Sequence, residues 1–169
     1  EKFTVMREAG KVVEAKPANA VSGVEGKSLA LIIGINEYLN NIPRLENATG
    51  DAQAVAAVLQ KDYGFENTVI LDEKATRAAI LKELNRLKTA LNPQDRLLIY
   101  YAGHGYYDKD TGTSYWLPAD ADRDETINWI DSKTITNELK RSRAKQILVV
   151  ADSCYAGTMD RAFTPNLAG

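Results

Sequence analysis

Four short apolar runs are spaced along the chain, and most of the segments between them show helical periodicity. Continuous runs of this kind, rich in β-branched residues, are typical of strands that are buried on both faces of a parallel sheet. The pattern therefore predicts four parallel strands, at "LALIIGI" (29–35), "NTVILD" (67–72), "RLLIYYA" (96–102) and "QILVVAD" (146–152).

The segments between these runs predict helices. In residues 48–65, Val55, Val58 and Leu59 are expected to face inward, with Gly64 near the C-terminus of the helix. Two further helices are expected at about 76–91 and 132–144, and a last short one near Cys154. Residues at i, i+4, i+7 and i+11 give the second of these helices one apolar face, formed by Ile80, Leu84, Leu87 and Leu91.

Strands that alternate with helices form right-handed βαβ units. We therefore predict an α/β fold, a three-layer sandwich in which helices cover both faces of a mostly parallel β-sheet. Residues 1–27 are interpreted as an N-terminal arm and linker, and 28–169 as the folded domain. Residues 106–131 lack clear periodicity and are expected to form a long loop at one end of the sheet, where α/β folds often place their chemistry.

Composition excludes several classes of partner. The 169 residues carry a net charge of −2, so nothing favours binding to nucleic acid or to an anionic membrane. The longest apolar runs are about eight residues, and a membrane-spanning helix needs about 20. A single cysteine cannot form an internal disulfide, and its free thiol favours a cytoplasmic location.

Two charged segments resemble binding motifs but are better explained otherwise. "GVEGKS" (23–28) has Val21 where a phosphate-binding loop requires its first glycine, and it precedes a predicted strand rather than following one. "KRSRAK" (140–145) lies at the predicted C-terminus of a helix, where cations complement the helix dipole. We interpret it as a solvated face.

The only histidine and the only cysteine each follow a predicted strand. His104 comes after the run 96–102, and Cys154 after the run 146–152. Because ligands of open α/β sheets bind outside the carboxyl ends of the strands, neighbouring strands would bring these two side chains to one pocket. An imidazole there can deprotonate the thiol and later protonate a leaving amine. The alternative is that each is an ordinary structural residue.

The neighbours of His104 fit this chemistry. Gly103 and Gly105 are expected to let the chain turn sharply, leaving the Gly105 N–H open to a substrate oxygen. With the N–H of Cys154, it would form an oxyanion hole. Zinc is a poor alternative, because one histidine and one cysteine leave two ligands to be found.

The motifs "YYAGHG" and "ADSCYAG", 50 residues apart, resemble the catalytic motifs of the caspase-like cysteine peptidases, which include metacaspases and paracaspases. The resemblance covers about residues 28–162. It implies a catalytic dyad of His104 and Cys154, with oxyanion donors at Gly105 and Cys154.

One departure from the caspases bears on specificity. The glutamine that caspases carry two residues before the cysteine is replaced by Asp152, as in metacaspases and paracaspases. Asp51 matches a second pocket acid of those relatives. The resemblance thus implies an S1 pocket that accepts arginine, or less well lysine. Alternatively, Asp51 caps a helix and Asp152 holds a loop.

Calcium activates many metacaspases, but the acidic run "DADRDE" does not have the spacing of an EF-hand loop. The paired acids of the family are matched only by Asp131, and Asp160 stands beside Arg161. We expect a solvated loop, no metal site and no required cofactor. Four aromatic residues lie near the proposed pocket in the sequence, namely Tyr106, Tyr107, Tyr115 and Trp116. They either line substrate subsites or pack the loop.

The family's peptidase domain continues well beyond the cysteine. The resemblance therefore implies a large-subunit-like piece, which is either a truncated polypeptide or one product of a proteolytic cut whose other part is a second chain. Regulation by proteolytic processing or partner binding is expected. We predict a cysteine endopeptidase that acts on peptides or proteins. The alternatives are a catalytically silent module that binds partners, and a phosphate-binding or receiver-like domain, which would need an acidic cluster after the first strand.

Overall fold

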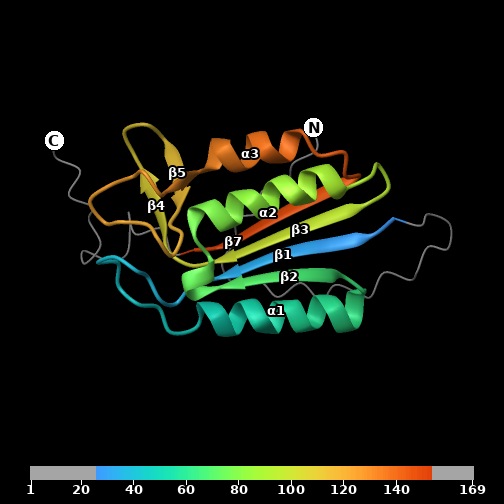
Figure 1. Cartoon of the computed structure of the whole chain (residues 1–169), viewed down its shortest axis with the longest axis horizontal. Coiled ribbons are helices and arrows are strands. Elements are labelled where there is room, and N and C mark those ends of the chain that lie inside the picture. The colour runs from blue at the N-terminus through green and yellow to red at the C-terminus, as the bar shows by residue number, and fades with distance from the viewer. Residues whose placement is uncertain (1–25, 154–169) are drawn as a thin grey trace.

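The computed structural model describes residues 26–153 (Figure 1). The four strands and the first three helices expected from the sequence are confirmed, with ends that differ by a few residues. In chain order the elements are β1 (Ser28–Gly34), α1 (Ala48–Tyr63), β2 (Glu66–Leu71), the 3₁₀ turn η1 (Asp72–Lys74), α2 (Arg77–Ala90), β3 (Arg96–Ala102), β4 (Gly105–Asp108), β5 (Thr113–Trp116), β6 (Ile130–Asp131), α3 (Ser132–Lys140) and β7 (Gln146–Asp152).

The main sheet has four parallel strands in the order β2-β1-β3-β7. Helix α1 covers one face, and α2 and α3 lie over the other, so the predicted three-layer α/β architecture is confirmed (Figure 1). Each face has its own core, because alternate residues of the buried strands point to opposite sides of the sheet. Leu31 and Ile33 pack on the α2 side, and Ala30 and Ile32 on the α1 side.

The inward face of α1 differs from the prediction. Val58 is 49% exposed, while Val55 and Leu59 pack only partly against the core. The buried residues of this helix are alanines, at positions 48, 52 and 56. A Cβ on Gly34 of β1 would lie 2.6 Å from the Ala52 Cβ, which shows how closely the helix approaches the sheet. Small side chains allow that approach, and the larger valine is left outside.

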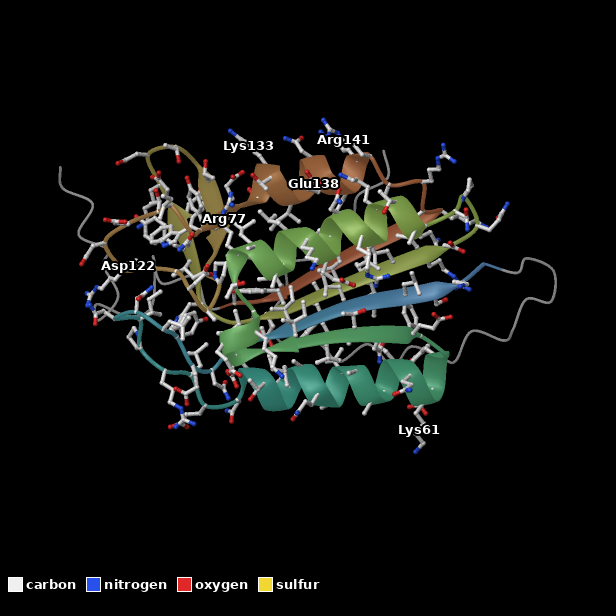
Figure 2. All side chains as sticks on the ribbon, in the orientation of Figure 1. Lys61, Arg77, Asp122, Lys133, Glu138 and Arg141 are labelled. Carbon is white, nitrogen blue, oxygen red and sulfur yellow. The ribbon has the colours of Figure 1, made fainter. Side chains whose placement is uncertain are left out.

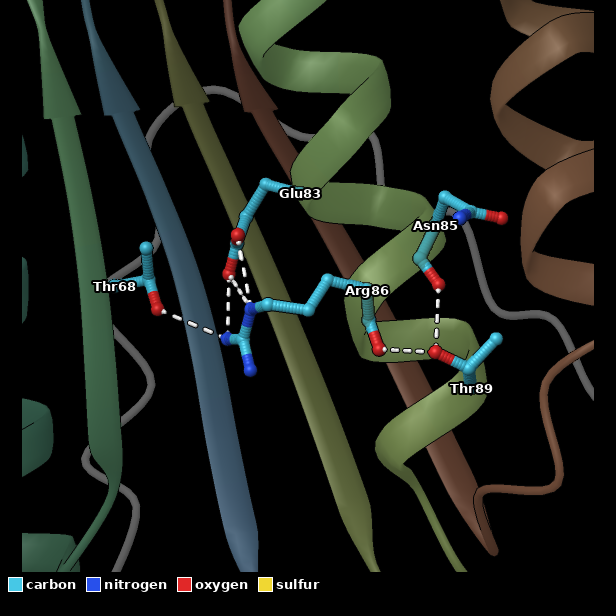
Figure 3. Close-up of polar contacts among 5 residues, drawn as sticks. All are labelled: Thr68, Glu83, Asn85, Arg86 and Thr89. Carbon is cyan, nitrogen blue, oxygen red and sulfur yellow. Dashed lines mark hydrogen bonds and ion pairs between the residues drawn. The ribbon is translucent and has the colours of Figure 1, made fainter.

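Helix α2 has the apolar face that its periodicity predicts. Ile80, Leu84 and Leu87 are buried, and Leu91 is buried just past its C-terminus. The Thr76 side chain accepts a hydrogen bond from the Ala79 N–H and caps the first turn. Polar contacts join α2 to the sheet (Figure 3). Arg86 pairs with Glu83 one turn earlier, and its Nη2 lies 3.4 Å from the Thr68 hydroxyl on β2.

Charged side chains lie on the outer side of helix α3 (Figure 2). They include Lys133 in its first turn and Arg141, which follows its last residue. Glu138 pairs instead with Lys88 of α2 at 2.6 Å and links the two helices. Lys140 lies in the last turn, as predicted for "KRSRAK".

Residues 106–131 are not one long loop. They contain β5, β6 and most of β4, which form a small antiparallel sheet in the order β4-β5-β6. These strands have only two to four residues, too few for an alternating pattern to be recognised. The expected position is confirmed, since the small sheet lies at the end of the main sheet where β3 leads into β4 (Figure 1).

Within the described range, no helix has the length and apolar character needed to span a bilayer. The predicted helix near Cys154 lies outside this range, as do nearly all of the predicted N-terminal arm and linker. The domain division at residues 27 and 28 stays a prediction, although β1 begins at Ser28.

Candidate active site

The histidine and cysteine motifs begin at neighbouring strand ends. Strands β3 and β7 are parallel neighbours, and each residue of β3 pairs with the residue fifty positions later, up to Ala102 with Asp152. His104 follows this last pair by two residues. Cys154 follows it by two residues in the sequence and lies outside the described residues. The register therefore starts both motifs from the same point at the carboxyl edge of the sheet.

The two motifs also touch. A Cβ on Gly105 would lie 2.9 Å from the Ser153 hydroxyl oxygen and 3.1 Å from the Ser153 Cβ. Glycine at position 105 thus allows close packing against the residue that precedes Cys154. The chain bends at Gly103, between β3 and β4, but neither Gly103 nor Gly105 has a positive φ, so the bend does not need the torsional freedom of glycine. They are required for space rather than for torsional freedom.

The imidazole of His104 is anchored by a main-chain carbonyl. Its Nε2 lies 2.8 Å from the oxygen of Pro43, in the loop between β1 and α1. A carbonyl can only accept, so we assign the proton to Nε2, which leaves the lone pair of the neutral ring on Nδ1. Burial lowers the pKa of His104 below its ordinary value, and the Pro43 bond opposes this in part. The lowered pKa keeps the imidazole unprotonated near neutral pH, as a side chain that acts as a base requires.

The main chain of His104 is held as well. Its N–H donates to the Tyr38 hydroxyl at 2.7 Å, and its carbonyl accepts from the Leu117 N–H at 3.1 Å. The Tyr38 ring also packs against the imidazole, with centroids 5.2 Å apart. Residues from two loops, 35–47 and 117–129, therefore fix one histidine.

The orientation of the Gly105 N–H follows from strand pairing. The Leu117 N–H donates to the His104 carbonyl, while the His104 N–H donates to Tyr38, and the next pair along the strands is Gly105 with Trp116. Positions that bond across an antiparallel ladder alternate with positions that do not, so the Gly105 N–H points away from β5. A donor in that orientation is suited to a substrate oxygen.

Both candidate pocket acids act on Tyr100. Asp152 Oδ2 accepts a hydrogen bond from the Tyr100 hydroxyl at 3.2 Å. Burial raises the pKa of Tyr100, and the negative charges of Asp152 and Asp51 raise it further, which places the tyrosine in the field of both carboxylates. Asp51 stands in the first turn of α1 and is not its N-cap, a position held by Asn47. The helix-capping alternative for Asp51 is therefore wrong.

The acids of the 120–131 region have structural partners. Asp131 caps α3, accepting from the Thr134 N–H at 2.8 Å and from its hydroxyl at 2.6 Å. Asp120 accepts from the Arg77 N–H, and Asp122 from the Asp124 N–H. Between residues 26 and 153, no three His, Cys, Asp or Glu side chains form a group that could hold a metal ion. Asp160 lies outside that range.

The aromatic residues near the site contact one another. Trp116 is buried and stacks on Tyr101, with centroids 4.5 Å apart, so it packs rather than lines a subsite. Tyr106 and Tyr115 both contact Trp129, which the sequence did not single out.

Sequence reasoning also missed the residues that hold His104 and Asp152 in place. Tyr38 and Pro43 lie 66 and 61 residues before His104, and a contact made by a main-chain carbonyl has no sequence signature. Tyr100 could have been found from the sequence. The fifty-residue spacing pairs it with Val150, two residues before Asp152, so Tyr100 and Asp152 lie on the same face of the sheet.

The chain belongs to the caspase domain family, a family of peptidases, and residues 27–167 match it. Among curated relatives, a metacaspase-1A of Neurospora crassa is 31% identical over 82% of this chain, and a metacaspase-1 of Schizosaccharomyces pombe is 30% identical over 88%. These matches cover 34% and 38% of the relatives, so the chain spans about a third of their length.

A solved structure supports the fold alone. The protein GSU0716 from Geobacter sulfurreducens superposes with a TM-score of 0.65 at 24% identity, covering 78% of this chain and 52% of the other. Family membership and the α/β fold inferred from the two motifs are thus confirmed.

Proposed function

We propose that this chain carries the nucleophile and the general base of a cysteine endopeptidase. The observation that carries the proposal is the fifty-residue register between β3 and β7, which starts the His104 and Cys154 motifs from adjacent points. Family membership and the anchored imidazole support it. A cysteine placed there for structure alone would not need an oriented base beside its strand.

The reaction uses the assigned tautomer of His104. Nδ1 takes the thiol proton of Cys154, and the thiolate attacks the carbonyl carbon of the scissile peptide bond. The N–H groups of Gly105 and Cys154 stabilise the resulting oxyanion. As the C–N bond breaks, the imidazolium gives its proton to the leaving amine. Water, deprotonated by His104, then hydrolyses the thioester and releases the acid and the thiol.

We propose that Asp51 and Asp152 select a basic P1 side chain. Two carboxylates in one pocket would attract a cation and repel an acidic residue, and a planar guanidinium could bond to both. Arginine is therefore favoured over lysine. The field of both acids at Tyr100 supports a shared site for them.

Strand β7 supports the proposal of an additional chain segment. Among the strands of residues 26–153 it lies at the edge of the sheet, and its Leu148 and Val150 are 37% and 38% exposed beside Leu98 and Tyr100 on the α1 face. Unpaired edge strands and uncovered apolar residues are costly in water. We propose that a further segment, on this chain or on a second chain, pairs with β7, and that processing or partner binding regulates activity. A smaller fragment that copurifies on a denaturing gel would identify a second chain.

The test is hydrolysis of matched fluorogenic peptides ending in Arg, Lys or Asp, by the longest polypeptide that contains this chain. Cleavage after Arg that is absent in Cys154→Ala would establish the dyad and the acidic pocket together. Cleavage after Asp would keep the peptidase and refute the roles of Asp51 and Asp152. No cleavage of any peptide would favour the alternative, a silent module that binds partners.

A further inference from the structure

The peptide groups on both sides of the His104 Cα are held by two phenols. The His104 N–H donates to the Tyr38 hydroxyl at 2.7 Å. On the other side, the His104 carbonyl oxygen lies 2.7 Å from the Tyr101 hydroxyl. Both hydroxyl oxygens also approach one point, the Cβ position of Gly103, at 2.8 Å for Tyr101 and 3.1 Å for Tyr38. The two phenols thus hold the His104 N–H and the His104 carbonyl from neighbouring positions.

The hydrogens in these contacts can be assigned. The Tyr38 oxygen accepts from the His104 amide, because an N–H group can only donate. Tyr101 has one hydrogen and two carbonyl oxygens in reach, those of His104 at 2.7 Å and Leu117 at 2.9 Å. Burial raises the pKa of Tyr38 well above its ordinary value, so the phenol keeps its proton at physiological pH. The His104 N–H and the Tyr101 hydroxyl thus each donate to an acceptor on the other side of the contact.

Gly103 leaves the space that the two phenols need. A Cβ at position 103 would lie 2.8 Å from the Tyr101 hydroxyl oxygen and 3.1 Å from that of Tyr38. Both oxygens thus converge on the α-carbon of the residue before His104. A side chain of any size would displace at least one phenol, which gives the first glycine of the "GHG" motif a physical reason.

We propose that Tyr38 and Tyr101 are positioning residues, which fix the main chain of His104 so that its imidazole stays oriented for catalysis. Tyr38 acts on both parts of the histidine, since its hydroxyl binds the amide and its ring packs on the imidazole. This inference rests on the proposed role of His104 as the general base. Misplacing a catalytic group by about 1 Å can reduce the rate on the order of 100-fold, so a main-chain anchor matters for the rate.

The test compares Tyr38→Phe with Tyr63→Phe, a matched loss of one hydroxyl from a half-exposed tyrosine at the end of α1. For cleavage of an arginine peptide, we expect kcat to fall about 10- to 100-fold in Tyr38→Phe with KM nearly unchanged. The Tyr63→Phe protein should match the wild type. Gly103→Ala should reproduce the loss without removing either hydroxyl.

A second readout does not depend on turnover. His104 is the only histidine, so ¹⁵N-histidine labelling of the full chain gives one backbone amide signal and one imidazole. In Tyr38→Phe we expect the His104 amide to exchange with solvent at least about tenfold faster, because it has lost its acceptor. The imidazole pKa should rise toward its ordinary value of about 6.5 as water reaches the ring.

The outcomes separate the two proposals. If Tyr38→Phe lowers thermal stability but leaves kcat, the amide exchange and the imidazole titration unchanged, the positioning role is refuted. If the amide and imidazole respond in Tyr38→Phe while the wild type shows no Cys154-dependent cleavage, the anchoring of His104 by Tyr38 is confirmed and the peptidase proposal fails.

Discussion

The histidine and the two acids of the candidate site are held in different ways. His104 is fixed at three points, by Tyr38 at its N–H, by Tyr101 and Leu117 at its carbonyl, and by Pro43 at its ring. Asp152 accepts one side-chain hydrogen bond, from Tyr100, and both Asp152 and Asp51 are exposed.

This difference follows from what each group would do. A general base acts only in one orientation, so its neighbours must remove its freedom. A pocket acid must keep its charge and its acceptor atoms available for an incoming cation, so extensive bonding within the protein would compete with the substrate. Substitutions of His104 should therefore affect the cleavage of all peptides, whereas substitutions of the two acids should affect mainly peptides with a basic P1 residue.

The largest effect is expected from His104→Asn. Loss of the general base should reduce kcat for all peptides by about 100- to 10,000-fold, whatever their P1 residue. Kinetics with arginine and lysine peptides would measure it. A residual rate near that of the wild type would contradict the assignment of His104 as the base.

A smaller and selective effect is expected from Asp152→Asn. Loss of one charge in contact with a guanidinium should lower kcat/KM for arginine peptides by about 10- to 100-fold, the amount associated with a hydrogen bond to a charged group. The reactivity of Cys154 toward iodoacetamide should not change, because the base is intact. Equal losses for peptides with neutral P1 residues would mean that Asp152 does not read the side chain.

A weaker effect is expected from Tyr100→Phe. This change removes the hydrogen bond that orients Asp152, while its charge remains. One neutral donor contributes about 0.5–1.5 kcal/mol, so kcat/KM for arginine peptides should fall by about 2- to 12-fold. The ratio of arginine to lysine cleavage should also fall, since a guanidinium depends more on geometry. An unchanged ratio would show that Tyr100 only packs.

The smallest effect is on stability at acid pH. Burial lowers the pKa of His104, so below about pH 6.5 the unfolded chain binds a proton that the folded chain resists. Stability from this group is therefore fully present above pH 6.5 and decreases as the pH falls toward the folded-state pKa. Urea unfolding of wild type and His104→Asn from pH 5 to 7.5 would isolate this contribution. Parallel curves for the two proteins would contradict the burial of the imidazole.

The main sheet and its helices could be predicted from the sequence, because each of these elements is long enough to show a recognisable hydrophobic pattern. Four apolar runs located the strands, and the equal spacing of His104 and Cys154 from two of them suggested a shared edge. The face of α1 was misjudged at Val58, because a hydrophobic scale favours valine where close approach to Gly34 favours alanine. The strands of the small sheet were missed because they are too short to show an alternating hydrophobic pattern.

The supports of the site were largely inaccessible. The contact of His104 with Pro43 uses a backbone oxygen that any residue could supply, and Tyr38 stands in a loop without periodicity. The sequence also did not reveal why position 103 is a glycine. Torsional freedom and the need for space both favour glycine, and only the positions of the two phenols show that space is the reason.

The most direct test of the central claim is the rate of Cys154 alkylation by iodoacetamide from pH 5 to 9, followed by mass spectrometry. The chain has a single cysteine, so each adduct reports on one thiol. We predict alkylation at pH 7 well above that of an ordinary thiol with a pKa of about 8.5, and a return to ordinary behaviour in His104→Asn. A slow wild-type reaction with the pH dependence of a free thiol, unchanged by His104→Asn, would contradict the account.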